Sequence, residues 1–106
     1  MKILLDVGVP IQLRRELPDH DVWTAVRMSW GKLENGELLS AAEKSGFELI
    51  IICDKNMRYQ QNLTGRTIAI LELWTNHRPT LEIHWSAIRA AVDSIHPKEY
   101  KTLPAP

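Results

Sequence analysis

The stretch ELIIICD, residues 48–54, holds four consecutive large aliphatic residues before a cysteine and an acid. A strand without polar alternation is covered on both faces, which is typical of a central strand in a parallel sheet. Two further stretches have the same apolar character, KILLD at residues 2–6 and RTIAILEL at residues 66–73. We expect these three stretches to form the centre of a buried sheet.

Segments with helical features separate these strands. A short helix is expected from Pro10, because proline suits the first turn, and a second from Asn35 as N-cap to a terminating glycine. Residues 56–63 predict a short helix, and apolar residues every three or four positions over residues 80–95 predict an amphipathic one. With a short strand at residues 21–25, this alternation predicts an α/β fold with a small, mainly parallel sheet and right-handed crossovers.

The composition is that of one globular domain. The chain has 106 residues, of which 44% are hydrophobic and 25% charged. We expect the domain to occupy residues 1–95, and residues 96–106, which are rich in proline, to form a flexible tail. The formal net charge of zero argues against a protein that coats nucleic acid by bulk electrostatics.

Cysteine content and hydropathy indicate the compartment. Cys53 is the single cysteine, so no intramolecular disulfide can form, and a reducing environment is expected. No apolar stretch reaches the roughly 20 residues that span a bilayer, and the N-terminus has no signal-peptide pattern. The sequence therefore predicts a cytoplasmic protein with no membrane partner.

Two of the apolar stretches end on an acid, Asp6 and Asp54. If the strands that precede Asp6 and Asp54 are neighbours in the sheet, their carboxyl ends lie about 4.8 Å apart. Ligand sites of parallel sheets form at this position. Two desolvated carboxylates so close repel each other unless a proton or a cation lies between them. Oxygen ligands of this kind favour Mg²⁺ or Mn²⁺. The sequence thus predicts a divalent metal site at the strand ends.

Each acid also has a purely structural interpretation. Asp54 precedes an expected helix and is a good N-cap, and Asp6 is placed to hold the loop that leads to Pro10. Glu37 falls in the first turn of an expected helix, where a negative charge complements the helix dipole. The metal hypothesis is preferred because the structural interpretation requires two acids at neighbouring strand ends by coincidence.

Three segments resemble one known family. ILLD at residues 3–6, SWGKLENGELL at residues 29–39 and DKNMRYQQNLTGRTIAIL at residues 54–71 resemble the PIN-like predicted nucleases of prokaryotic toxin–antitoxin systems. The resemblance covers residues 1 to about 71. It implies a three-layer α/β/α PIN-like fold, Mg²⁺- or Mn²⁺-dependent hydrolysis of RNA, and restraint by a cognate antitoxin protein.

The resemblance also implies which residues form the site. The family acids fall on Asp6, Glu37 and Asp54, as metal ligands and catalytic residues. The family's polar signature falls on a group that includes Asn56 and Gln61, which we expect to contact substrate. Two neighbouring cations are further candidates for holding the substrate phosphate, Lys55 and Arg58.

One departure from the family pattern bears on activity. The family has Asp-Glu-Asn after the first strand, whereas this chain has Asp6, Val7 and Gly8. The missing carboxylate implies one bound ion instead of two, or a catalytically silent module kept for protein binding. A phospho-acceptor receiver domain is disfavoured, because it also needs paired acids after the first strand and a lysine after a late one.

Tryptophan content bears on partners. The chain has four tryptophans, and Trp30 lies in the polar stretch SWGKLENG. Together with the resemblance to toxins, this favours a homodimer or capture of a small partner protein. We therefore expect a metal-dependent ribonuclease, the toxin of a toxin–antitoxin pair, with a silent PIN-like binding module as the alternative.

Overall fold

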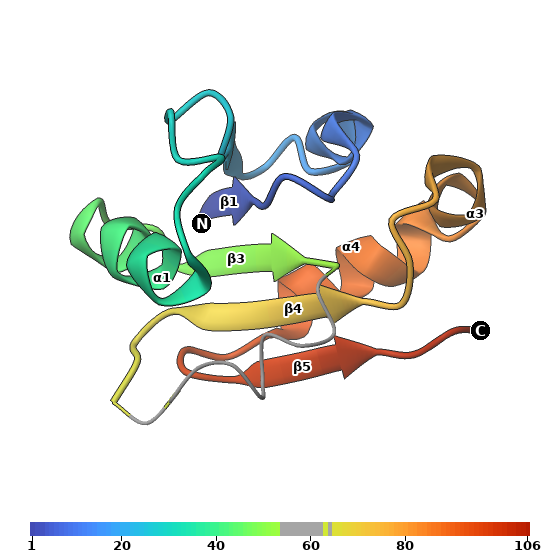
Figure 1. Ribbon diagram of the computed structural model, residues 1–106. Helices are drawn as coiled ribbons and strands as arrows, with labels where there is room; N and C mark the ends of the chain where they lie inside the picture. Colours follow the sequence, from blue (N-terminus) through green and yellow to red (C-terminus); the bar gives the residue numbers. More distant parts are fainter. Residues whose placement is uncertain (54–62, 64) are drawn as a thin grey trace.

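The computed structural model (Figure 1) describes residues 1–53, 63 and 65–106. This part of the chain forms a compact α/β domain around a five-stranded sheet in which all strands are parallel. The strand order is β2-β1-β3-β4-β5. The strands are β1 (Lys2–Leu5), β2 (Asp21–Thr24), β3 (Leu49–Ile52), β4 (Ala69–Leu73) and β5 (Tyr100–Leu103).

The three apolar stretches form the centre of the sheet, as predicted. In β3 every side chain from Leu49 to Ile52 is fully buried, because side chains that alternate between faces meet apolar cover on both. β1 pairs with β3 in the register Ile3↔Leu49, so the expected neighbour relation of these strands is confirmed. Burial of each such aliphatic side chain contributes about 1.5–3 kcal/mol.

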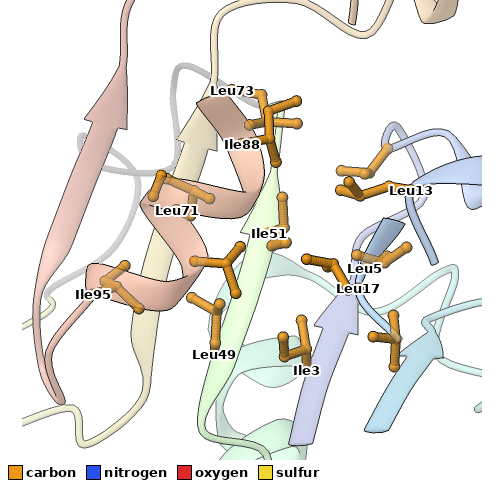
Figure 2. Packing of buried hydrophobic residues seen from close by; sticks show 14 of the residues in the cluster. Ile3, Leu5, Leu13, Leu17, Leu49, Ile51, Leu71, Leu73, Ile88 and Ile95 are labelled. Atoms are coloured by element: carbon orange, nitrogen blue, oxygen red, sulfur yellow. The ribbon is translucent and has the colours of Figure 1, made fainter. Parts of the chain in front are cut away.

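Each face of the sheet carries its own hydrophobic cluster. Ile3, Leu5 and Ile51 point to the face covered by η1 (Ile11–Glu16) and α4 (Trp85–Ser94), as Figure 2 shows. Alternate residues of the same strands, such as Leu4 and Ile50, point to the face covered by α1 (Asn35–Lys44). The alternation within β1 and β3 therefore decides which helix packs on which face.

The strand order reverses direction at β1. β2 lies on one side of β1, while β3, β4 and β5 follow in order on the other. This is one of the common orders of doubly wound sheets, and its reversal point lies between β1 and β3. Ligand sites of such sheets form outside the carboxyl ends of the strands at that point.

The expectation of right-handed crossovers is wrong for the last unit. The connections β2–α1–β3 and β4–α3–α4–β5 both run toward the β5 edge, yet α1 lies in front of the sheet and α4 behind it (Figure 1). They therefore have opposite hands, and the second is left-handed, against the roughly 98% preference for right-handed crossovers. η1 and α4 cover the same face of the sheet. Because η1 is only six residues long, α4 is needed to cover the rest of that face.

Three helix predictions need correction. The segment after Pro10 is a 3-10 helix, and the N-cap of α1 is Glu34 instead of Asn35. The amphipathic stretch expected over residues 80–95 is two helices, α3 (Arg78–Ile83) and α4, which meet at His84. The periodicity continues across this junction, because Leu81 and Ile88 both reach the same core. None of the helices in the described ranges is both long and apolar enough to cross a membrane.

The prediction of a flexible tail over residues 96–106 is wrong for its middle part. Tyr100–Leu103 forms β5, which pairs with β4 along its length. The Tyr100 hydroxyl donates a hydrogen bond of 2.6 Å to the Glu72 carboxylate, which is buried in β4. The domain therefore extends through residue 103, beyond the boundary expected at residue 95.

We predict that two truncations will have different effects on stability, because only one of them removes β5. Ending the chain after Leu103 removes exposed residues and leaves the melting temperature unchanged. Ending it after Pro97 removes β5, exposes the β4 edge and leaves Glu72 buried without the Tyr100 hydroxyl, which costs about 1–3 kcal/mol for that group alone. Thermal unfolding followed by circular dichroism compares the three chains. Equal melting temperatures for both truncations would contradict the placement of β5.

Candidate functional site

A depression of about 320 Å³ opens at the carboxyl edge of the sheet, beside the reversal point between β1 and β3. The segments that follow β1, β2, β3 and β4 line it, together with Asn35 at the start of α1. Its lining residues are Asp6, Val7, Gly8, Gly31, Leu33, Asn35, Cys53 and Asn76.

Asp6 follows β1 directly and is held in place by its main chain. Its N–H donates to the Ile51 carbonyl at 3.0 Å, and its carbonyl accepts from Val9 at 3.0 Å. Its carboxylate oxygen Oδ1 accepts from the Val7 N–H at 2.8 Å. These bonds give Asp6 the loop-holding role that the sequence left open, and they fix a half-buried carboxylate at the depression.

Cys53 lies beside Asp6 at the end of β3. Burial of the thiol, together with the nearby negative charge of Asp6, raises the pKa of Cys53 to about 12. Its Sγ donates to the Thr75 carbonyl at 3.3 Å. The thiol is therefore neutral at physiological pH, and sulfur is a poor metal ligand in that form. Asp6 and Cys53, at the ends of β1 and β3, line the same depression.

Glu37 is placed differently from the expectation. Its side chain accepts from the Glu34 N–H at 3.2 Å and completes a capping box at the start of α1. It lines a second depression with Ser40, Lys44 and Arg66, which shares only Leu33 with the first. The described contacts thus assign Glu37 to helix capping and do not bring it together with Asp6.

The remaining expected site residues fall in the stretch that follows β3. Asp54, as a metal ligand, lies outside the described residues. The same holds for the expected substrate-binding residues, Lys55, Asn56, Arg58 and Gln61. Within the described ranges, no group of three or more histidine, cysteine, aspartate or glutamate side chains is arranged to hold a metal ion.

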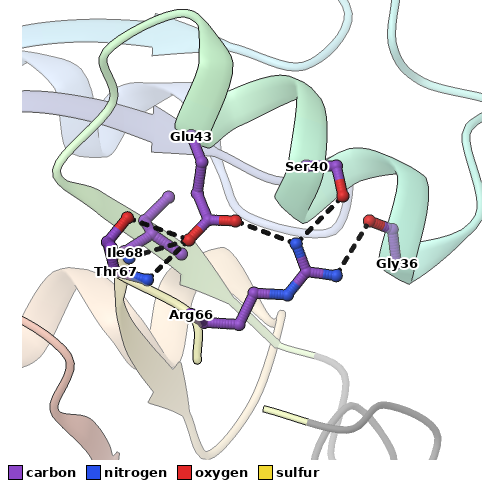
Figure 3. A network of polar contacts seen from close by, with 6 residues as sticks. All are labelled: Gly36, Ser40, Glu43, Arg66, Thr67 and Ile68. Atoms are coloured by element: carbon purple, nitrogen blue, oxygen red, sulfur yellow. Dashed lines mark hydrogen bonds and ion pairs between the residues drawn. The ribbon is translucent and has the colours of Figure 1, made fainter. Parts of the chain in front are cut away.

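Arg66 joins α1 to the segment before β4. Its Nη1 donates to Glu43 Oε1 at 2.8 Å and to Ser40 Oγ at 2.9 Å, as Figure 3 shows. Its Nη2 donates to the Gly36 carbonyl at 3.4 Å. These contacts occupy the guanidinium, so Arg66 is a structural residue.

The other oxygen of Glu43 anchors the start of β4. Oε2 accepts from the main chain of Thr67 at 2.6 Å and of Ile68 at 3.3 Å, and from the Thr67 hydroxyl at 3.0 Å. Burial alone would raise the pKa of Glu43, but the hydrogen bonds from Arg66, Thr67 and Ile68 lower it from 4.5 to about 2. The ionised carboxylate is therefore a clamp between α1 and β4.

Two residues with amide side chains line the depression although the sequence does not predict them as site residues. Asn35 is expected as a helix cap, and Asn76 lies in the loop that follows β4. The rule that sites gather after strand ends, applied to β4 as well as to β1 and β3, would have found Asn76. Both line the depression together with Asp6.

Comparison with protein-family models, with curated proteins and with solved structures finds no match for this chain.

We predict that Glu43→Gln destabilises the protein in a pH-dependent way. At neutral pH the free energy of unfolding falls by about 1.5–3 kcal/mol, because charged hydrogen bonds become neutral ones. In the wild type this contribution is complete above pH 4.5 and is lost as the pH falls toward about 2, so the two proteins converge in acid. Urea unfolding across this pH range measures the difference.

Glu82→Gln is the matched control, because it removes an exposed i,i+4 partner of Arg78. We expect it to change stability by less than about 0.5 kcal/mol. A loss for Glu43→Gln that is the same at neutral pH and in acid would contradict the charged clamp.

Proposed function

We propose that this protein is a PIN-like, metal-dependent ribonuclease with the three-layer α/β/α arrangement of that class. The proposal is supported chiefly by Asp6, a half-buried carboxylate at the reversal point of the sheet, which lines a depression together with Cys53 at the end of β3. In the sequence the next residue after Cys53 is Asp54. The resemblance adds the toxin role, with a cognate antitoxin as the protein partner and the cytoplasm as the compartment.

The chemistry of the depression suits Mg²⁺ or Mn²⁺. Asp6, Asn35 and Asn76 offer oxygen ligands, and the Cys53 thiol beside them is neutral. Mg²⁺ keeps several waters and needs only one or two protein carboxylates plus substrate phosphate. Asp6 and Asp54 would hold the ion, with Glu37 a further candidate from the resemblance. Such an ion, when held by these residues, would supply the activation of water and the neutralisation of charge on the scissile phosphate.

The chain's own residues prepare this position. The Val7 N–H holds one carboxylate oxygen of Asp6, which orients the side chain before any ligand arrives. The amides of Asn35 and Asn76 can donate to phosphate oxygens at the rim of the depression. Lys55 and Arg58 are the proposed cations for the substrate phosphate, together with Asn56 and Gln61.

A catalytically silent binding module is the second candidate, and Val7 favours it. Val7 stands where the family has a carboxylate, and its side chain is 56% exposed on the wall of the depression. An exposed aliphatic residue beside a site that needs negative ligands is better suited to contact with a protein than to metal binding. A silent module of this kind would have the same fold and bind a protein partner, but it would not hydrolyse RNA.

We predict RNA cleavage that depends on Mg²⁺ or Mn²⁺ and on Asp6. Asp6→Asn keeps the size of the side chain and its bond to Val7 but removes the charge, so cleavage of a labelled single-stranded RNA falls at least about a hundredfold. The matched control is Asp19→Asn, an exposed aspartate in the turn before β2, which leaves the rate unchanged.

The reaction is followed on a gel with and without chelator. Cleavage that survives chelation, or that Asp6→Asn leaves intact, would contradict the enzyme proposal. An absence of cleavage by the wild type at every metal concentration would instead favour the silent module.

A further inference from the structure

A groove of about 720 Å³, separate from the two depressions described above, lies between η1 and the turn that follows β2. Its lining combines aliphatic and guanidinium side chains, and among the described residues that form it none is acidic. The lining residues are Ile11, Gln12, Arg14, Arg15, Thr24, Val26 and Arg27. None of the proposed metal ligands is among them.

Exposed aliphatic side chains gather at this groove. Of the four large hydrophobic residues that the described chain exposes, Ile11 (64%) and Val26 (70%) line the groove. A third, Val7 (56%), lines the strand-end depression. A Cβ placed on Gly31 would lie 3.5 Å from Val7 and 4.0 Å from Val26, which shows that these two valines flank the same point of the chain. Single exposed aliphatic residues are ordinary, whereas a cluster marks an interaction surface.

The arginines of the groove differ from the other arginines of the described chain. Arg66, Arg78 and Arg89 each pair with a glutamate. In the same described ranges, none of the three groove arginines forms an ion pair, and all are exposed: Arg14, Arg15 and Arg27. In a molecule with no formal net charge, three positive charges that form no ion pair within the described ranges therefore lie beside an aliphatic surface.

We propose that this groove binds an acidic segment of a partner protein that carries aliphatic side chains between its carboxylates. Guanidinium groups bind carboxylates in pairs of parallel hydrogen bonds, and protein interfaces are enriched in arginine. Ile11 and Val26 supply the apolar contact that such a segment would bury. The inference goes beyond the proposed nuclease activity, because the groove has its own residues and its binding needs no metal.

The lining favours a protein over RNA as the occupant. Single-stranded nucleic acid binds on aromatic side chains that stack with its bases. The groove's described lining has no aromatic residue, and the nearby Trp23 ring already lies 5.1 Å from the Arg27 guanidinium. Val26 of the groove lies near Gly31, which lines the strand-end depression together with Val7.

The test uses defined probes and the full chain in the presence of chelator. A labelled short peptide of alternating glutamate and leucine is titrated by fluorescence anisotropy, beside the same peptide with glutamine for glutamate and beside labelled oligouridylate. The acidic peptide binds at least about tenfold more tightly than the glutamine peptide. Backbone amide shifts in the wild type are expected at residues 11–15 and 24–27.

Two matched triple variants locate the charge that matters. Changing Arg14, Arg15 and Arg27 to glutamine weakens binding of the acidic peptide at least about tenfold. The control changes three exposed cations elsewhere to glutamine and leaves binding within about twofold; these are Lys44, Arg78 and Lys98. Val26→Ser, which keeps all charges, also weakens binding, because the apolar contact is lost.

Three results would each overturn the proposal. The first is equal binding of the acidic and glutamine peptides, and the second is equal loss in both triple variants. The third is groove-dependent binding of oligouridylate without binding of the acidic peptide, which would make the groove a nucleic-acid site. RNA cleavage measured separately shows whether the nuclease proposal stands or falls independently.

Discussion

The pairing of β1 with β3 is the constraint on which the rest of the molecule depends. Its register, with Leu4 opposite Ile50, buries the aliphatic side chains of both strands on both faces of the sheet. Because β1 then lies inside the sheet, the chain must place β2 on one side and β3 on the other. That reversal opens the carboxyl edge, and it is why Asp6 lies beside Cys53 in a depression instead of on a closed surface.

The molecule uses its half-buried carboxylates in two ways. Glu43 is surrounded by donors from Arg66, Thr67 and Ile68, which hold its pKa at about 2 and make it a permanent structural anion. Asp6 lines a depression with the neutral thiol of Cys53 and two amide residues, and its negative charge contributes to the raised pKa of that thiol. A carboxylate whose surroundings contain oxygen groups suits a hard cation, whereas one enclosed by a guanidinium and main-chain N–H groups has no need of one.

The sequence predicts the buried parts of this fold well and its edges poorly. The three apolar stretches leave no alternative to central strands, and the strand-end rule places Asp6. β5, with the sequence YKTL, is a half-exposed edge strand with few apolar residues, so the sequence predicts a tail at this position. The hand of the last crossover depends on which face α4 covers, which no local pattern records. Glu37 was expected in the site by resemblance, although Glu34 three residues earlier forms a capping-box spacing.

The most direct test of the shared metal site is thermal unfolding of the wild type, Asp6→Asn and Asp54→Asn in chelator and in Mn²⁺. If the two acids hold one cation, their repulsion destabilises the metal-free wild type, so both variants melt higher than it does in chelator. Mn²⁺ at a hundred times its Kd stabilises the wild type by about 2.7 kcal/mol and leaves both variants unchanged. If the wild type gains nothing from Mn²⁺ and both variants melt at or below it in chelator, the strand-end acids do not form a cation site.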